Sequence, residues 1–311
     1  MSEIPLHDLV IRHISEYLCG DNKTLCALMR LCKRFYGLRD MFYKQISLNP
    51  PQSVCAHETK PYGWNKVHYL ILRRCHDITD VSALGSIYSI FFDTCYNIYD
   101  VSPLGSVHEL IIVNCPKISD VSALGTVHKL EIWECPKISD VSALYGVHTL
   151  VLDCYNNIKD VSALGKVYSL QLLNCRNIIG LELLQNVHDL CLNSYDVNNS
   201  DLLFFKTIHT LSLQSCDKIT DVSYLNNIYE LTLESCYDIC DVSALGRVHT
   251  LTLIECDGIT DVSALCGVYS LTINECHNIS DFSLVDHIPC LRIKNYKNYN
   301  LHCQSMQQKI E

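Results

Sequence analysis

The chain has 311 residues, a formal net charge of −10 and 48% apolar residues, which suffices for a repeat array and one small domain. No apolar run reaches the length of a membrane span, and the start of the sequence lacks a hydrophobic signal segment, so we expect no membrane contact and no secretion. The negative charge disfavours nucleic-acid binding. No phosphate loop, nucleophile elbow or metal-ligand pair occurs. We therefore expect no enzyme, no catalytic residue, no cofactor and no metal site.

Residues 1–44 do not repeat. They carry seven Lys or Arg and five Asp or Glu, a net +2 that leaves −12 on the rest of the chain. Apolar residues from Leu6 to Leu18 recur at helical spacing, and a second amphipathic helix is expected from about Lys23 to Leu38. Two or three short helices bury too little surface to be stable alone. This small all-α domain therefore needs a partner, either the rest of the chain or another protein.

Residues 45–66 are expected to form a linker and an N-terminal cap. Ile46 to Leu48 predict a first, imperfect strand, and Pro50-Pro51 predicts a loop. Trp64 is expected to cover the open end of the core, as the terminal units of repeat proteins require. At the other end, the polar residues 296–311 predict a cap that continues into a tail.

Residues 67–295 contain about 11 units of 20 residues. Asp-Val-Ser or a close variant marks each unit, and the step from Gly180 to Asp201 alone has 21 residues. The Asp members of this grid are Asp80, Asp100, Asp120, Asp140, Asp160, Asp201, Asp221, Asp241, Asp261 and Asp281. Self-similarity at such a period indicates a solenoid or a propeller.

Each unit predicts a short strand followed by a tight turn. In one unit the apolar residues are Val107, Leu110 and Ile112, and then every third residue as far as Leu124. The Leu-x-Ile step indicates a strand with one buried face, and the later steps of three suit a 3₁₀ turn, since so short a coil leaves no room for an α-helix. The grid Asp is expected to cap this turn by accepting a backbone N–H. A positive φ is expected at the glycines that follow the turn, Gly85, Gly105, Gly125, Gly165 and Gly246.

Nine of the 19 cysteines share one position of the repeat: Cys75, Cys95, Cys115, Cys135, Cys175, Cys216, Cys236, Cys256 and Cys276. Stacked units place neighbours within disulfide range, but parallel Cβ vectors oppose pairing. Tyr155 and Tyr195 take the same position in two units. We interpret the cysteines as unpaired, buried hydrophobic residues in a reducing compartment, the cytoplasm or nucleus.

The repeat resembles the leucine-rich repeat. Segments such as Cys75 to Asp80 are similar to the Cys-Asn-Ile-Thr-Asp type of its cysteine-containing subclass, with one residue more between Cys and Ile, and Asp-Val-Ser-Ala-Leu is similar to the turn of internalin-type repeats. The resemblance implies an α/β solenoid, with a parallel β-sheet on the concave face and short 3₁₀ turns on the convex face. Such arrays also look like those abundant in large DNA viruses of amoebae, which would place the protein in a host cytoplasm.

Residues 1–44 resemble the F-box. The likeness rests on Ile4-Pro5-Leu6, the Ile14 to Leu18 step and Leu31-Cys32-Lys33-Arg34-Phe35. It implies binding to a Skp1-like adaptor and, through it, to a cullin–RING ubiquitin ligase. The implied adaptor-binding residues are Pro5, Leu9, Ile14, Leu18, Leu25, Leu28 and Leu31. The alternative is that these side chains only cap the first coil.

Alternation along the strands predicts which side chains lie on the concave face. Apolar and aromatic residues gather in the N-terminal half, whereas Thr and Ser dominate the C-terminal half. We expect the first group to bind a target protein: Tyr69, Ile71, Phe91, Ile111, Val113 and Trp133. The alternative is plain β-propensity on an exposed face, which accounts better for Thr than for Trp133.

A His or Tyr recurs beside each strand, as at His68, Tyr88 and His108. We interpret this column as a stacked aromatic ladder, since Tyr interrupts any chelating series, and expect that charging its imidazoles below about pH 6 destabilises the array. We expect the Asp grid to bind no calcium, because the glycine-rich turns of calcium-binding β-helices are missing from the sequence.

The leading hypothesis is a monomeric, non-catalytic substrate receptor of a Skp1–cullin–F-box ubiquitin ligase. A stand-alone interaction scaffold with a helical cap is the alternative, and an F-box decoy is a third. The target protein cannot be identified from the sequence.

Overall fold

The computed structural model describes residues 45–48, 68–76, 78–153, 157–194 and 196–294, of which 45–48 are described as backbone only. Two compact units divide the chain, one ending at Val147 and the other beginning at His148. Residues 1–44 and the tail 296–311 lie outside the described residues, as do Trp64, Tyr155 and Tyr195.

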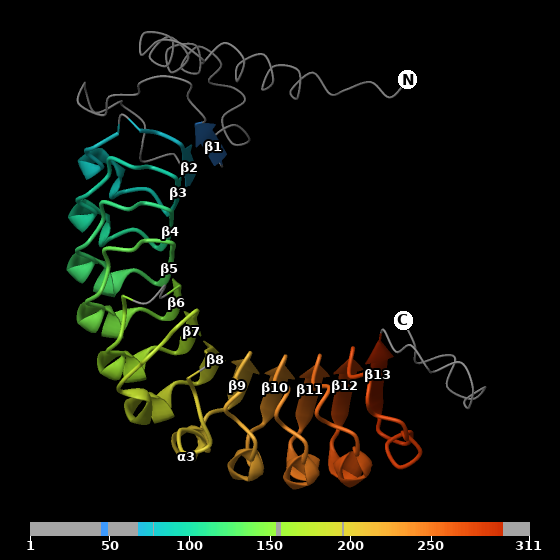
Figure 1. The fold of residues 1–311 in the computed structure, drawn as a ribbon. Helices are drawn as coiled ribbons and strands as arrows, with labels where there is room; N and C mark the ends of the chain where they lie inside the picture. The colour runs from blue at the N-terminus through green and yellow to red at the C-terminus, as the bar shows by residue number, and fades with distance from the viewer. Residues whose placement is uncertain (1–44, 49–67, 77, 154–156, 195, 295–311) are drawn as a thin grey trace, which may run out of the picture. The chain divides into compact units, whose positions relative to one another are not determined.

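The first unit alternates parallel strands with 3₁₀ turns (Figure 1). Its strands are β1 (Gln45–Leu48), β2 (Tyr69–Arg73), β3 (Ser89–Asp93), β4 (Glu109–Val113) and β5 (Lys129–Trp133). Its turns are η2 (Ser82–Leu84), η3 (Ser102–Leu104), η4 (Ser122–Thr126) and η5 (Ser142–Gly146). The predicted first strand is confirmed, because β1 pairs in parallel with β2.

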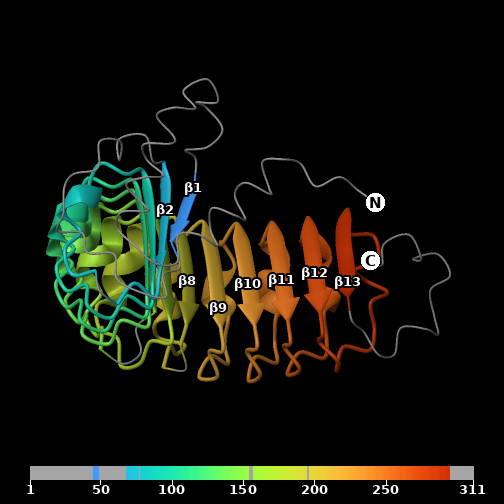
Figure 2. The same cartoon turned by 90° about the horizontal axis from the view of Figure 1, so that it is seen from above.

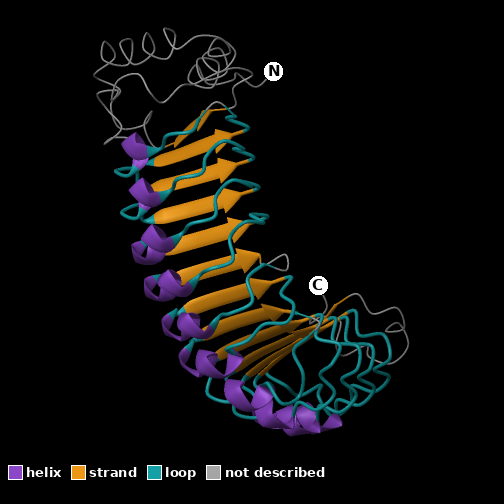
Figure 3. Ribbon diagram, turned by 60° about the vertical axis from the view of Figure 1, so that its left-hand side comes forward, coloured by secondary structure: helices purple, strands orange, loops and turns teal. Residues whose placement is uncertain are grey.

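The second unit has the same plan. Its strands are β6 (Thr149–Asp153), β7 (Ser169–Leu173), β8 (Asp189–Asn193), β9 (Thr210–Gln214), β10 (Glu230–Glu234), β11 (Thr250–Ile254), β12 (Ser270–Asn274) and β13 (Cys290–Lys294). Its turns are η6 (Ser162–Lys166), η7 (Leu181–Asn186), α3 (Leu202–Phe205), η8 (Ser223–Leu225), η9 (Ser243–Arg247) and η10 (Ser263–Gly267). Strands β8 to β13 run side by side (Figure 2). In both units the turns lie on the side of the coil opposite the strands (Figure 3).

The core of each unit is a set of apolar columns, one residue per coil. In the coil that contains β4, Leu110, Ile112, Cys115 and Ile118 are fully buried, and the column pattern repeats in its neighbours. Each buried Leu or Ile contributes about 1.5–3 kcal/mol relative to an exposed one. The predicted apolar pattern is therefore confirmed, and stacking buries a face that one coil could not bury alone.

The turns are closed by local hydrogen bonds, as the Asp-Val-Ser pattern predicts. In the coil of η2, the backbone N–H of Leu84 donates to the Val81 carbonyl over 2.9 Å, a 3₁₀ bond. The backbone N–H of Ser82 donates to Asp80 Oδ1 over 2.8 Å. Equivalent bonds join Ser and Asp in the other Asp-Val-Ser and Asp-Phe-Ser coils. Asp201 differs, because its Oδ2 accepts from the N–H of Asn198.

The prediction of a positive φ at the glycines after the turns is wrong. The φ of Gly85 is −61° and that of Gly105 is −60°. Glycine is needed there for close approach, since a Cβ at Gly85 would lie 2.4 Å from the Pro103 carbonyl oxygen of the next coil. Among the described residues, Gly180 is the glycine with a positive φ, at 90°. It opens the coil that lacks the grid Asp.

Left-handed backbone occurs instead directly after strands β2 to β5, at a position that the sequence analysis missed. Arg74, Thr94, Asn114 and Glu134 have φ between 51° and 59°. The backbone N–H of Thr94 still donates to the Val113 carbonyl over 2.9 Å, and that of Asn114 to the Trp133 carbonyl over 3.0 Å. The hydrogen bond to the next coil thus holds a conformation that costs a non-glycine residue about 1 kcal/mol.

The extra residue of the 21-residue step changes one turn. Where most coils have 3₁₀ turns, the 21-residue step is followed by α3, a single α-helical turn. The expectation that these short coils leave no room for an α-helix is therefore wrong for this coil. Phe205 is fully buried at the position that Leu occupies in the 3₁₀ turns.

The repeated cysteines are buried thiols, with one exception. Cys95 and Cys115 are buried in the first unit, as are Cys216 and Cys236 in the second, and all four are free. The hydrogen bond with the Cys95 thiol, together with burial, raises the pKa of Cys115 and keeps its thiol protonated. Cys175 is disulfide-bonded, so the prediction that the whole column is unpaired is wrong at this position. The other eight cysteines of the column are not disulfide-bonded, so Cys175 pairs outside the column, where the parallel Cβ vectors that oppose pairing do not apply.

Candidate functional site

The strand face of the first unit carries an apolar group that we call the strand-face patch, consisting of Phe91, Ile111, Val113 and Trp133. Phe91 and Ile111 are register partners on β3 and β4. Val113 and Trp133 are register partners on β4 and β5. All four side chains are half-buried, because each packs against its neighbours on the next strand while its outer surface faces solvent. Register partners lie about 5 Å apart, so the four side chains form one continuous surface.

Charged side chains flank the patch and pair with one another. Arg73 Nε lies 3.6 Å from Asp93 Oδ2, and its guanidinium carbon lies 5.5 Å from the centre of the Phe91 ring. On the other flank, Lys129 Nζ lies 2.9 Å from Glu131 Oε1. The hydrogen bond to Glu131 raises the pKa of Lys129.

Glu131 also holds the indole of Trp133. Trp133 Nε1 donates to Glu131 Oε2 over 3.2 Å. The carboxylate therefore joins Lys129 and Trp133, so that one edge of the indole is fixed. A large amphipathic ring held in one orientation loses little conformational entropy on binding, which favours its use as an anchor.

Two further residues predicted for this site lie elsewhere in the sheet. Tyr69 is half-buried at the start of β2, as an outward position requires. Ile71, however, is only 7% exposed. Its register partners are Ser47 of β1 and Phe91 of β3, so strands flank it on both sides. The prediction that Ile71 faces outward for contact is therefore corrected.

The strand face of the second unit has a different chemistry. Ser212, Thr232, Thr252 and Thr272 form a half-buried hydroxyl column along β9 to β12. At the start of this unit Val151 and Asp153 are buried rather than outward-facing, and Asn174 Nδ2 donates to Asp153 Oδ1 over 2.8 Å. The predicted contrast between the two halves of the array is therefore present.

The predicted adaptor-binding residues Pro5, Leu9, Ile14, Leu18, Leu25, Leu28 and Leu31 all lie outside the described residues. Their role stays a prediction.

The predicted aromatic ladder is confirmed. In the first unit His68, Tyr88, His108 and His128 stack with ring centres 4.4–4.5 Å apart. A longer stack of the same kind runs from His148 to Tyr269 in the second unit, with spacings of 4.4–4.8 Å. The rings are close to parallel, so the column packs as a continuous aromatic strip.

Asp189, beside His188, contacts this ladder, and the sequence analysis did not single it out. His188 Nδ1 lies 2.7 Å from Asp189 Oδ1. In the described part of the chain, His188, Asp189 and His209 form one group of possible metal ligands. Their ligand atoms lie within 4.8 Å of one another. The His188 and His209 rings stack at 4.5 Å. Parallel rings direct their nitrogen lone pairs side by side rather than toward one ion, so this geometry disfavours chelation by both.

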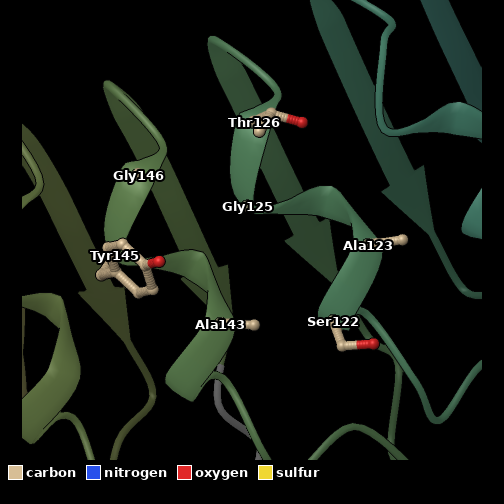
Figure 4. A pocket seen from close by; sticks show the side chains of 7 residues that line it. All are labelled: Ser122, Ala123, Gly125, Thr126, Ala143, Tyr145 and Gly146. Carbon is tan, nitrogen blue, oxygen red and sulfur yellow. The ribbon is translucent and has the colours of Figure 1, made fainter.

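The turn face of the first unit has an open groove of about 490 Å³ (Figure 4). Ala123, Gly125, Ala143 and Gly146 line it, with the Tyr145 side chain at one side. No charged side chain lines it. The groove follows from the small residues that close stacking demands, and we assign no ligand to it.

No helix among the described residues is both long and apolar enough to cross a bilayer. No protein-family model matches the sequence, and no curated protein matches it either.

Solved structures do match. Internalin InlF from Listeria monocytogenes is 20% identical, with 75% of this chain and 76% of that chain covered and a TM-score of 0.52. Internalin C2 from the same species is 22% identical over 61% of this chain and 82% of that chain, with a TM-score of 0.38. The functional domain of InlJ, which includes a cysteine ladder, is 15% identical over 76% and 74%, with a TM-score of 0.35. The likeness to InlF agrees with the alternation of parallel strands and short turns in both units. The chain therefore contains a leucine-rich repeat array with the internalin type of fold.

Proposed function

We propose that the chain is a non-catalytic protein-binding module that holds a target protein on the strand-face patch. The observation that carries the proposal is the confinement of Phe91, Ile111, Val113 and Trp133 to the strand face of one unit, whereas that of the other unit carries a hydroxyl column. Plain β-propensity accounts for the hydroxyl column, but it does not account for the gathering of Phe91 and Trp133 in one unit. Aromatic anchors rimmed by paired charges are instead typical of protein–protein interfaces.

The charges on the rim support binding over catalysis. Arg73 pairs with Asp93, and Lys129 pairs with Glu131. Each ionised group thus has a partner at hand, whereas a catalytic acid or base works with an unsatisfied, shifted group in a cleft. The net charge of −10 also disfavours a nucleic-acid target.

The test uses a paired substitution in the patch. A Phe91→Ser/Trp133→Ser variant should fold, because both residues are half-buried on the strand face, yet lose its target. Proteins crosslinked to the full chain in cells would be identified by mass spectrometry for wild type and variant. A Thr232→Ala/Thr252→Ala variant, altered on the other strand face, is the matched control and should keep the same targets.

We propose further that residues 1–44 bind a Skp1-like adaptor, which would make the chain a substrate receptor of a cullin ubiquitin ligase. This finer proposal is supported by the F-box-like residues Ile4 to Leu9, Ile14 to Leu18 and Leu31 to Phe35. The net +2 of this segment beside an acidic array also marks it as a separate element.

Co-purification with a eukaryotic Skp1 tests the finer proposal. Wild type should capture Skp1, and a Pro5→Ala/Leu9→Ala variant should not, while its melting temperature stays unchanged. The patch variant Phe91→Ser/Trp133→Ser should still capture Skp1. Two results would contradict this finer proposal: a folded wild type that captures no Skp1, or a Pro5→Ala/Leu9→Ala variant whose repeat array is unfolded. Either result would favour the alternative, a stand-alone interaction scaffold in which residues 1–44 act as a cap.

A further inference from the structure

Three neighbouring coils of the second unit break the repeat pattern on the turn face. The residue before the buried Leu of the turn is Ala in most coils, as at Ala83, Ala123, Ala163, Ala244 and Ala264. In η7, α3 and η8 the same position holds Leu183, Phe204 and Tyr224. We call these three residues the turn-face stripe.

The stripe exposes large apolar side chains where the repeat needs none. Leu183 is 48% exposed, Phe204 37% and Tyr224 44%, and Leu203 beside Phe204 is 43% exposed. The buried positions of the same turns are already filled by Leu184, Phe205 and Leu225. The stripe therefore lies outside the buried columns. Its three large, partly exposed side chains on adjacent coils form an apolar patch of the kind that marks an interaction site.

The spacing of the stripe suits a helix lying across the coils. Stacked coils recur about every 4.8 Å at the sheet, and one α-helical turn rises about 5.4 Å. A helix laid along the stack would therefore present one apolar residue to each coil at i, i+3 or i+4, and i+7.

The charges beside the stripe differ between its two sides. Before the stripe residues in the chain come Glu182 within η7, and Asp201 and Asp221 just ahead of their turns, where each also accepts one backbone N–H. On the exit side lie Gln185, Lys206 and Asn226. One flank is thus acidic, and the other carries two amides and one cation. A complementary helix would carry basic residues along one flank and neutral polar residues along the other.

We propose that the turn-face stripe binds an amphipathic helix of a partner protein, with Lys or Arg residues of that helix facing Glu182, Asp201 and Asp221. This surface lies on the turn side of the coils and does not depend on the strand-face patch. The chain thereby has a second docking site for a helical ligand.

The test uses a designed helical peptide with Leu at i, i+3, i+7 and i+10, Lys along one flank and Gln along the other. Fluorescence anisotropy would measure its binding to the full chain. The triple variant Leu183→Ala/Phe204→Ala/Tyr224→Ala, which restores the usual Ala of the repeat, should fold and bind about tenfold or more weakly. Leu284→Ala, at the same repeat position but separated from the stripe by Ala244 and Ala264, should bind like wild type.

Two further measurements separate the possible occupants. A peptide with Glu in place of Lys should bind more weakly than the Lys peptide, and added salt should weaken the Lys peptide. Equal binding by wild type and a folded triple variant would overturn the proposal. Self-association of wild type that the triple variant loses, seen by analytical ultracentrifugation, would also overturn it and assign the stripe to a second copy of the chain.

Discussion

A Cβ atom placed on Gly125 would lie 2.1 Å from the carbonyl oxygen of Ala143 in the next coil. Backbone atoms of neighbouring turns thus meet at a distance that only glycine permits. Where the glycine position is taken by Tyr145 or Cys266, the following residue is Gly146 or Gly267, and a Cβ there would lie 2.5 or 2.4 Å from a carbonyl of the preceding coil. The close contact is therefore kept even where the glycine moves by one residue.

Gly125→Ala should separate two coils and destabilise the first unit by about 1–3 kcal/mol, the usual cost of forced overpacking. Cys266→Ala is the matched control, because the Cys266 side chain is exposed and its loss should change stability by less than about 0.5 kcal/mol. Urea unfolding of both variants measures the difference. Equal stabilities would show that the coils can shift apart without cost.

Thr94 is a β-branched residue with a φ of 59°, which is an unfavourable combination. The equivalent residues Asn114 and Asn174 are of a type that tolerates this conformation. Thr94→Asn should therefore stabilise the protein by about 0.5–1 kcal/mol, and Asn114→Thr should destabilise it by a similar amount. Thermal melts of the reciprocal pair check the prediction, and shifts of the same sign in both variants would contradict it.

The grid carboxylates should make stability depend on acid. Hydrogen bonds from the backbone amide and the side chain of the following Ser hold the pKa of Asp120, Asp221 and Asp261 below the ordinary value. Because the unfolded chain takes up protons at a higher pH than the folded chain, the stabilisation is complete above the ordinary pKa of about 3.9 and is lost as pH falls through the folded-state pKa. The melting temperature should therefore drop as the pH is lowered below about pH 4.

A variant with Asn at four grid positions is the control for this acid response. Asp221→Asn, Asp241→Asn, Asp261→Asn and Asp281→Asn keep a side-chain oxygen that can accept the serine N–H but remove the titration. The combined variant should lose less stability than wild type between about pH 5 and about pH 3. An equal loss of stability in wild type and variant would show that the acid response comes from groups other than these four carboxylates.

His209 stacks between His188 at 4.5 Å and Tyr229 at 4.7 Å. His209→Ala removes both contacts and should cost about 1 kcal/mol or more, given the usual contribution of an aromatic pair. His209→Tyr keeps a ring in a ladder that already contains Tyr168 and Tyr229, and it should cost less than about 0.5 kcal/mol. Urea unfolding of the two variants compares them, and equal losses would show that stacking contributes little.

Period and apolar spacing were enough to predict the strands, the turns, the buried columns and the aromatic ladder, because each depends on residue type at a fixed place in the coil. The glycines were misinterpreted because a sequence shows which residue is small but not that the Pro103 carbonyl approaches Gly85. The left-handed conformation after the strands could not be predicted from residue type, because Arg74 and Glu134 do not favour it. Hydrogen bonds between coils impose it.

The candidate site could be predicted as a face but not in its details. Alternation along the strands correctly places Phe91, Val113 and Trp133 on one surface. It could not show that Ile71 is buried, because alternation gives the face of a strand and not how far neighbouring strands enclose a position on that face. The link between Glu131 and Trp133 was also hidden, since i, i+2 neighbours share a face without being bound to contact.

The most direct test of the proposed function is a comparison of the proteins crosslinked to wild type, to Phe91→Ser/Trp133→Ser and to Thr232→Ala/Thr252→Ala, each shown to be folded by thermal melting. We expect wild type and the Thr variant to recover the same target proteins and the Phe91→Ser/Trp133→Ser variant to lose them. Recovery of the same proteins by all three would contradict binding at the strand-face patch.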